Sequence, residues 1–228
     1  MQTYILDNNY HRTLLVKLGD PDTKQPEVSR LIEAIYQSLF TTVVSQELEA
    51  ETIQKKTRVF AGDSRGVYEG EVFKSDQKVV VVDLIRAGME PSTLFYHKLT
   101  EILNPNDVRL DHIMAQRIDG ESGVEDVNLM ASKIGGPIED AIVFLPDPMG
   151  ATGYSIQKVI EFYLKNHGQP KKFVVVHLVI APEYLKKLEE IQVPLAVYVA
   201  RKDGGLTAND YIYPGLGGVG EVISNTVA

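Results

Sequence analysis

The chain contains no cysteine. This absence excludes disulfide bonds, thiolate nucleophiles, cysteine-ligated zinc and iron–sulfur clusters. It also has no long hydrophobic run: the longest, residues 173–182, contains a histidine and is far shorter than the ~20 residues needed to cross a bilayer. The first residues lack the basic stretch and apolar segment typical of a signal peptide. We therefore expect a soluble cytoplasmic protein without a membrane partner.

Basic residues are in the minority, with 23 Lys and Arg against 31 Asp and Glu and a formal net charge of −8. A general nucleic-acid binder needs a basic surface to neutralise phosphates, so no nucleic-acid partner is expected. The 228 residues are 44% hydrophobic and 24% charged, which is typical of globular proteins and argues against disorder. No repeat, low-complexity tract or linker divides the chain, so we expect a single domain, 1–228.

Hydrophobic periodicity predicts an α/β fold. Helical spacing of apolar residues indicates an amphipathic helix over 28–43, and the polar, glycine-containing segment 52–75 indicates a hairpin or an irregular lid. Beyond residue 78, continuous apolar runs alternate with helix-period segments, as expected for a parallel sheet covered on both faces. The ligand site of such a sheet lies beyond the carboxyl ends of its strands. The expected strands are 79–82, 110–115, 141–145, 173–180 and 195–199, and the expected helices are 91–103, 156–164 and one starting at Pro182.

A loop of small residues, 147–155, lies between an expected strand and an expected helix. Its backbone N–H groups, the hydroxyls of Thr152 and Ser155, and the positive end of the helix suit a phosphate dianion. Asp147 is placed to accept hydrogen bonds from sugar hydroxyls or to hold a metal ion through water. The alternative is an ordinary turn in which Thr152 or Ser155 caps the helix.

Two further segments fall at this edge of the predicted sheet. Arg86 follows the strand of valines, and its planar guanidinium can bind phosphate oxygens with two hydrogen bonds. Alternatively, Arg86 is a surface arginine paired with a carboxylate. Asp83, at the end of the same strand, could by itself be the phosphate acceptor of a receiver-like domain. The glycine-rich segment 211–221 is expected to be an ordered loop with exposed backbone, the alternative being a flexible tail.

Histidines give no sign of a metal site. The five histidines show no spacing typical of metal ligands, and any metal ligand set stays open. His177, inside the strongest predicted strand, is expected to be a hydrogen-bonded core residue.

The three segments resemble those of type I phosphoribosyltransferases, in particular the uracil phosphoribosyltransferase family. Residues 147–155 resemble the loop that binds phosphoribosyl pyrophosphate (PRPP), the sequence Leu-Ile-Arg-Ala-Gly at 84–88 resembles the pyrophosphate-binding strand end, and 211–221 resembles the base-binding loop. Arg117 resembles the arginine at the start of that family's flexible acidic loop. The motifs occur in the family's order over essentially the whole chain.

The resemblance implies a type I phosphoribosyltransferase fold, with a core over about 76–200 and a small hood formed by 1–75 and 201–228. It implies transfer of ribose 5-phosphate from PRPP to uracil, giving UMP and pyrophosphate, with Mg²⁺ bound mainly through PRPP near Asp147. A homodimer or larger homo-oligomer is also implied. By the resemblance, the catalytic residues are Asp147 and Arg86, the PRPP-binding residues are Arg86, Arg117, Asp147, Pro148, Met149, Gly150, Ala151, Thr152, Gly153, Tyr154 and Ser155, and the uracil-binding residues are Ile212, Gly217, Gly218 and Val219.

Several positions depart from the family pattern, and three of them bear on the activity. Gly150 replaces a leucine, Tyr154 replaces a glycine, and Gly218 replaces an aspartate that serves the PRPP and metal region. These departures keep a second hypothesis open, in which the chain is a catalytically degenerate phosphoribosyltransferase-fold protein that binds PRPP or a nucleotide as a regulator.

Overall fold

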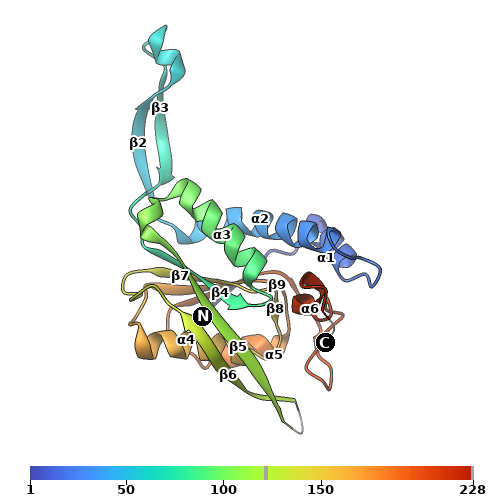
Figure 1. The fold of residues 1–228 in the computed structure, drawn as a ribbon. Helices are drawn as coiled ribbons and strands as arrows, with labels where there is room; N and C mark the ends of the chain where they lie inside the picture. The colour runs from blue at the N-terminus through green and yellow to red at the C-terminus, as the bar shows by residue number, and fades with distance from the viewer. Residues whose placement is uncertain (121–122, 227–228) are drawn as a thin grey trace.

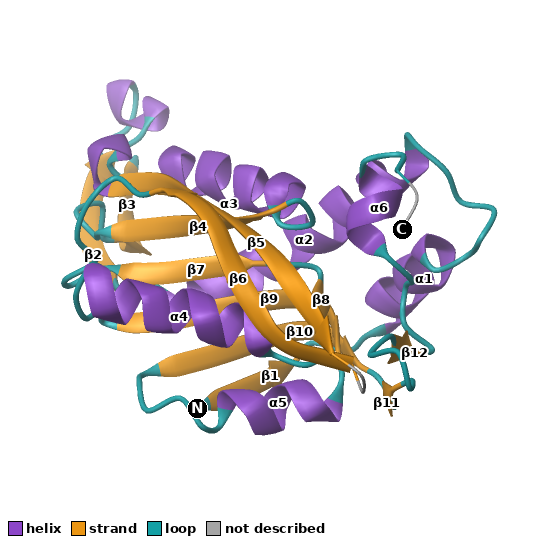
Figure 2. Cartoon of the chain, turned by 60° about the horizontal axis from the view of Figure 1, so that its bottom comes forward, coloured by secondary structure: helices purple, strands orange, loops and turns teal. Residues whose placement is uncertain are grey.

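A computed structural model describes residues 1–120 and 123–226. Its centre is an eight-stranded sheet in which every pairing is parallel except that of the last two strands. This arrangement, with helices on both faces, confirms the expected fold class (Figures 1 and 2). The strands run across the sheet in the order β1 (Gln2–Ile5), β10 (Leu195–Lys202), β9 (Lys172–Ile180), β7 (Ile142–Pro146), β4 (Val79–Ile85), β5 (Val108–Gly120) and β6 (Gly123–Lys133), with β8 (Met149–Gly150) paired beside β9.

Two hydrophobic clusters, one on each face, explain why the strand sequences are continuously apolar. In β4, Val79 and Val81 belong to one cluster, whereas Val80 and Val82 belong to the other. Because successive side chains of a strand point to opposite faces, a strand covered on both sides has no exposed position for polar residues. Valine runs that lack polar alternation therefore lie in the middle of the sheet.

Helices cover the two faces (Figure 2). The first face is covered by α2 (Glu27–Glu47) and α3 (Met89–Ile102), with α1 (Asn9–Leu18) packed against α2. The predicted apolar stripe of α2 is buried, which confirms that helix. The second face is covered by α4 (Tyr154–Asn166) and α5 (Pro182–Leu188). Within the part of the chain that the structure describes, no helix is both long and apolar enough to cross a membrane.

Several elements were not expected from the sequence. Among them are α1, β1, which joins the sheet beside β10, and β6, which pairs with a β5 longer than predicted. β1 is mostly exposed and lacks an apolar run, so its position depends on pairing with the edge of β10 rather than on a local pattern. The division into a core and a hood remains a prediction. β1 and α2, which fall in the predicted hood, lie in the main sheet and against its face.

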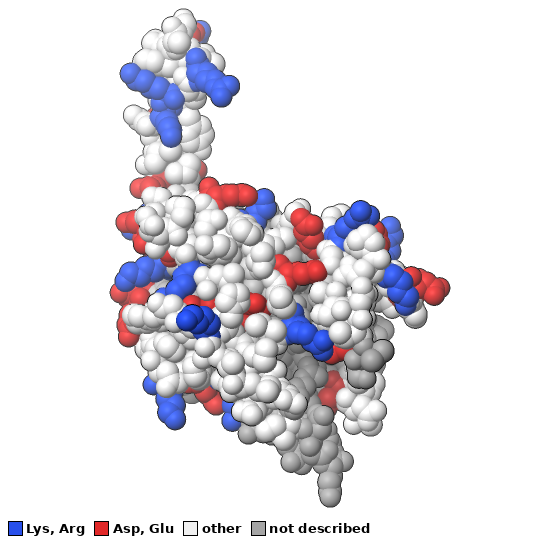
Figure 3. Space-filling model, viewed as in Figure 1, with Lys and Arg blue, Asp and Glu red and all other residues white. Residues whose placement is uncertain are grey.

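A hairpin of β2 (Ala50–Lys56) and β3 (Val67–Phe73) projects from the body (Figure 1). It confirms the hairpin predicted over 52–75, and its turn contains the short helix η1 (Arg58–Ala61). Figure 3 shows basic side chains at its far end, where Lys55, Lys56, Arg58 and Arg65 are exposed, whereas both signs of charge are mixed over the visible face of the body.

The C-terminal residues form a small layer beside α1 and the carboxyl ends of the strands (Figures 1 and 2). It contains β11 (Gly205–Leu206), β12 (Ile212–Tyr213) and α6 (Val219–Ile223). A further short helix, η2 (Pro105–Asp107), precedes β5. The connection after α1 touches this layer, since a Cβ placed on Gly19 would lie 3.4 Å from the Gly215 carbonyl oxygen.

Candidate active site

The carboxyl end of β4 leads into a tight turn that presents Arg86. The Ile85–Arg86 peptide is cis, and the Gly88 N–H donates to the Leu84 carbonyl at 2.9 Å. The Arg86 guanidinium reaches the C-terminal layer: Nη1 donates to Thr226 Oγ1 at 3.0 Å and Nη2 to Glu221 Oε1 at 3.3 Å. Its side chain is 46% exposed. The carboxylate pairing that we considered as an alternative for Arg86 is therefore present, and the carboxylate belongs to α6.

The loop after β7 runs alongside the second half of β9. Three hydrogen bonds fix it there: the Asp147 N–H donates to Val176 O at 3.0 Å, Leu178 N–H to Pro148 O at 3.0 Å, and Ala181 N–H to Gly150 O at 2.9 Å. Because β9 is buried and hydrogen-bonded on both sides, the loop rests on a rigid strand.

The amino end of α4 follows directly from this loop. Gly153 precedes the helix with a φ of 88°, in the left-handed region that favours glycine, and in the described part of the chain no side chain caps α4. The interpretation that Thr152 or Ser155 caps the helix is therefore wrong. In contrast, Asn8 caps α1 by accepting from the His11 N–H at 2.9 Å. An uncapped helix start leaves backbone N–H groups for an anion.

Close packing explains the glycine at position 150. A Cβ there would lie 2.7 Å from Ile180 Cγ2 and 3.0 Å from Tyr184 Cγ, so the space that a larger residue would fill is occupied by Tyr184. The ring of Tyr154 lies against α5, with Lys187 Nζ 4.7 Å from its centroid. Lys187 also packs over Gly153, where a Cβ would lie 2.9 Å from Lys187 Cβ. The two departures in this loop thus correspond to contacts with α5.

His177, on β9, is hydrogen-bonded to the backbone of the same loop. Its Nδ1 is hydrogen-bonded to the Asp147 carbonyl, and its Nε2 lies 2.6 Å from the Tyr184 hydroxyl. Complete burial lowers the pKa of His177 to about 4, so the ring is neutral at physiological pH. A neutral ring satisfies both contacts if Nδ1–H donates to Asp147 and Nε2 accepts from Tyr184. His177 is a satisfied core residue, as predicted, but its contact with the Asp147 backbone was not foreseen.

Asp147 itself is half-buried at the mouth of the loop. Burial, with a further contribution from the Asp147 charge, raises the pKa of Tyr36 and of Tyr184 well above the usual value. Both phenols therefore stay protonated, and the Asp147 carboxylate lies close enough to influence them.

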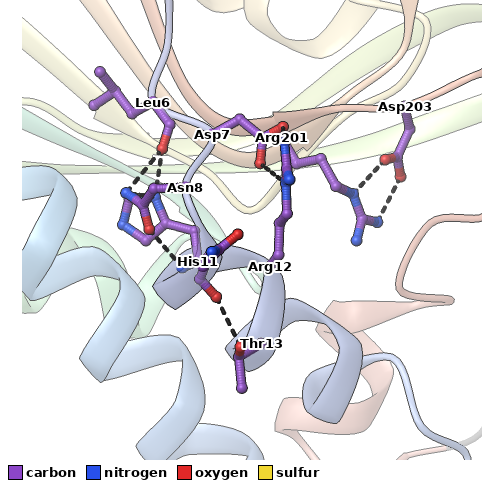
Figure 4. A network of polar contacts seen from close by, with 9 residues as sticks. Leu6, Asp7, Asn8, His11, Arg12, Thr13, Arg201 and Asp203 are labelled. Atoms are coloured by element: carbon purple, nitrogen blue, oxygen red, sulfur yellow. Dashed lines mark hydrogen bonds and ion pairs between the residues drawn. The ribbon is translucent and has the colours of Figure 1, made fainter.

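The glycine-rich C-terminal segment is an ordered loop rather than a flexible tail. Ile212 and Val219 are only 5% and 3% exposed, so their side chains anchor the segment in the core. The Gly215 N–H donates to Asp203 Oδ2 at 3.0 Å, and the Asp203 carboxylate also accepts from Nε and Nη2 of Arg201 (Figure 4). This loop and the connection between α1 and α2 together line a hollow of about 260 Å³.

A side chain on the Cα of Gly218 would displace the end of the Glu221 side chain. A Cβ built there would lie 2.6 Å from Glu221 Oε2. The place where the family pattern puts an aspartate is thus beside another carboxylate, which comes from one turn further along the chain.

Asp83 is unsuited to accept a phosphoryl group. Its side chain is 5% exposed, and Oδ2 is bound to His112 Nδ1 at 2.8 Å. Burial raises the pKa of Asp83, although the hydrogen bond with His112 opposes this effect. Oδ1 is buried without a partner among the described residues. The receiver-like interpretation is therefore not supported.

Two further predictions concern Arg117 and the ligands of a metal ion. Arg117 lies on β5, and its side chain is outside the described residues. Among the side chains that the structure describes, no three or more His, Asp or Glu residues are arranged to hold a metal ion.

The fold and these loops agree with three comparisons. A family model described as uracil phosphoribosyltransferase matches residues 5–226. The uracil phosphoribosyltransferase of Burkholderia mallei is 29% identical over 224 residues, covering 98% of this chain and 94% of that protein. That of Pyrobaculum islandicum is 29% identical over 225 residues, covering 97% of this chain and 98% of that protein. The structure of the AQ2163 protein from Aquifex aeolicus superposes over 100% of both chains with a TM-score of 0.79 at 21% identity, which is a likeness of fold.

The family match makes this protein a phosphoribosyltransferase, and its mostly parallel sheet with an open helix start at the carboxyl edge agrees with that class of enzyme. The chain belongs to the uracil phosphoribosyltransferase family.

Proposed function

We propose that this protein transfers ribose 5-phosphate from PRPP to uracil, giving UMP and pyrophosphate. The observation that carries the proposal is the gathering of the three motifs at the carboxyl edge of one sheet. Arg86 follows β4, the 147–155 loop follows β7, and the C-terminal loop follows β10. Strands β4, β7, β9 and β10 are parallel neighbours in that order across the sheet. A substrate bound at that edge would meet all three at once.

The reaction breaks the bond between ribose C1 and pyrophosphate and forms a bond between C1 and uracil N1. In this proposal the backbone N–H groups of 150–155 bind the 5-phosphate, and Asp147 accepts hydrogen bonds from the ribose hydroxyls. Arg86, with Arg117, stabilises the negative charge of the departing pyrophosphate. The backbone at Ile212 and Gly217–Val219 holds the uracil edge, and the N1 proton passes to water or to a main-chain carbonyl. Catalysis then consists mainly of positioning and electrostatic stabilisation.

Mg²⁺ is the cofactor implied by the resemblance. Mg²⁺ is usually held by one or two carboxylates together with substrate phosphates and waters, and Asp147, half-buried beside the loop, can supply one of them. When bound, the ion would neutralise charge on the leaving pyrophosphate. The donor set therefore fits an ion held mainly by PRPP.

The direct test measures pyrophosphate release with PRPP, Mg²⁺ and a panel of nucleobases. We expect release with uracil, and an Arg86→Ala variant should lose about 10²–10³-fold in turnover, the scale of a removed transition-state donor. Arg30→Ala is the matched control, because Arg30 is an exposed arginine of α2 in a loose pair with Glu27. Unchanged turnover in Arg86→Ala would contradict the role of Arg86. If none of the nucleobases gives pyrophosphate release, the proposed function is wrong.

The second hypothesis is a regulator that binds PRPP without turnover, and Gly218 favours it because that position lacks the family's carboxylate. Measuring PRPP binding together with pyrophosphate release distinguishes the two hypotheses. Binding of PRPP by calorimetry without pyrophosphate release would establish the regulator, whereas binding with release would exclude it.

We also propose a homodimer or larger homo-oligomer. The hairpin of β2 and β3 projects from the body and exposes Val59, Val67 and Tyr68, and an isolated two-stranded hairpin is only marginally stable in water. A partner subunit that covers the hairpin would bury these apolar side chains and stabilise it. Sedimentation velocity tests the assembly, and a monomer over the accessible concentration range would contradict it.

A further inference from the structure

Glu221 lies between two positions of the candidate site. Its Oε1 is 3.3 Å from Arg86 Nη2, and its Oε2 lies 2.6 Å from the point where a side chain on Gly218 would begin. The Glu221 N–H donates to the Gly218 carbonyl at 3.1 Å, so both residues belong to the first turn of α6. One carboxylate therefore contacts the arginine and fills the space above the glycine.

The surroundings of α6 fix the helix that carries this carboxylate. Val219, at the start of the helix, is buried, and the Gln25 side chain of the α1–α2 connection donates to the Ile223 carbonyl at 2.9 Å. A Cβ on Gly220 would lie 3.5 Å from Ala87 Cβ, so α6 is in van der Waals reach of the turn that presents Arg86. Glu221 and Arg86 thus meet on two segments that are packed together.

We propose that Glu221 is the positioning residue for Arg86, and that glycine at position 218 leaves the Glu221 carboxylate undisturbed beside that arginine. This inference rests on the proposed function, in which Arg86 binds pyrophosphate. The guanidinium has five N–H groups, and Glu221 and Thr226 use two of them, which leaves three for phosphate oxygens. A long side chain held in advance loses less conformational entropy when it binds its ligand.

The proposal separates function from folding. Glu221 and Arg86 are partly exposed, and ion pairs of this kind contribute little to stability. We therefore expect Glu221→Ala to unfold in urea at nearly the wild-type midpoint, while its kcat/KM for PRPP falls about tenfold and its KM for uracil changes less than about twofold. Glu101→Ala is the matched control, since Glu101 forms an exposed pair with Lys98 on α3 and should leave both constants unchanged.

Two combinations of variants test the mechanism. If Glu221 acts through Arg86, Glu221→Ala should have no further effect in the Arg86→Ala background. If position 218 and Glu221 compete for one space, Gly218→Asp alone should lower kcat/KM for PRPP, and adding Glu221→Ala should restore it to within about threefold of wild type. A merely structural role for Glu221 would not be rescued by a carboxylate at another position.

Calorimetry with inorganic pyrophosphate gives a readout that does not need turnover. Binding should weaken about tenfold in Glu221→Ala. Three results would each overturn the inference while leaving the proposed function intact. They are unchanged kinetics and binding in Glu221→Ala, additive losses when Glu221→Ala is combined with Arg86→Ala, and tighter pyrophosphate binding by Glu221→Ala. The last result would mean that the carboxylate competes with the ligand. If the wild-type protein neither releases nor binds pyrophosphate, the proposed function falls, and this inference falls with it.

Discussion

Protonation of His177 should couple the stability of this protein to pH. The ring is buried between the Asp147 carbonyl and the Tyr184 hydroxyl, and its pKa in the folded protein is about 4 against an ordinary value of 6.5. Between these two values the unfolded chain binds a proton that the folded chain does not. The free energy of unfolding therefore falls as pH drops through this window. At roughly 1.4 kcal/mol per pKa unit, the full loss is about 3 kcal/mol.

The variant His177→Asn removes this titration but keeps a donor for the Asp147 carbonyl. We expect it to be less stable than wild type at neutral pH, because asparagine leaves the Tyr184 hydroxyl without its acceptor, at a cost of about 1–3 kcal/mol. The difference between the two proteins should shrink as pH falls from about 7.5 to about 4.5, since only the wild type loses the His177 contribution.

Urea unfolding followed by far-UV circular dichroism at several pH values measures both effects. His97→Asn serves as the control, because His97 is exposed on α3 and its replacement should leave the wild-type pH dependence in place. Parallel stability curves for wild type and His177→Asn across the window would refute the reasoning, since they would show that His177 does not titrate differently in the folded protein.

Two further predictions concern the loops of the site. Gly150→Ala should destabilise the protein by about 1–3 kcal/mol in urea unfolding, because its methyl group would overlap Ile180 and Tyr184. Gly62→Ala, where the added Cβ meets none of the described atoms within 4 Å, is the control, and equal midpoints for the two variants would contradict this prediction. Asp203→Asn should raise the KM for uracil about tenfold, because it weakens the hydrogen bond that holds the Gly215 N–H. The KM for PRPP should change little. Equal effects on both constants in initial-rate measurements would count against that assignment.

Local sequence patterns determined the framework of this protein. The runs at 79–82, 173–180 and 195–199 lie in strands of the sheet, and all but the first residue of the run at 141–145 does, because a strand buried on both faces needs apolar residues at every position. Helical spacing predicted α2 for the same reason, since one face of that helix is buried. Small residues at 147–155 and 211–221 marked segments that are mostly loop, although these segments also contain β8, β12 and the starts of α4 and α6.

The tertiary structure alone decided which side chains meet. Asp147 and His177 are 30 positions apart, and Arg86 and Glu221 are 135 apart, so neither contact follows from a periodic pattern. Strand β1 likewise depends on the free edge of β10 and not on its own composition. These contacts arise from strand register and from the packing of α6 on the turn after β4, which are set by the whole folded chain. The sequence by itself determined where the loops lie, and only the fold decided that a carboxylate of α6 stands beside Gly218.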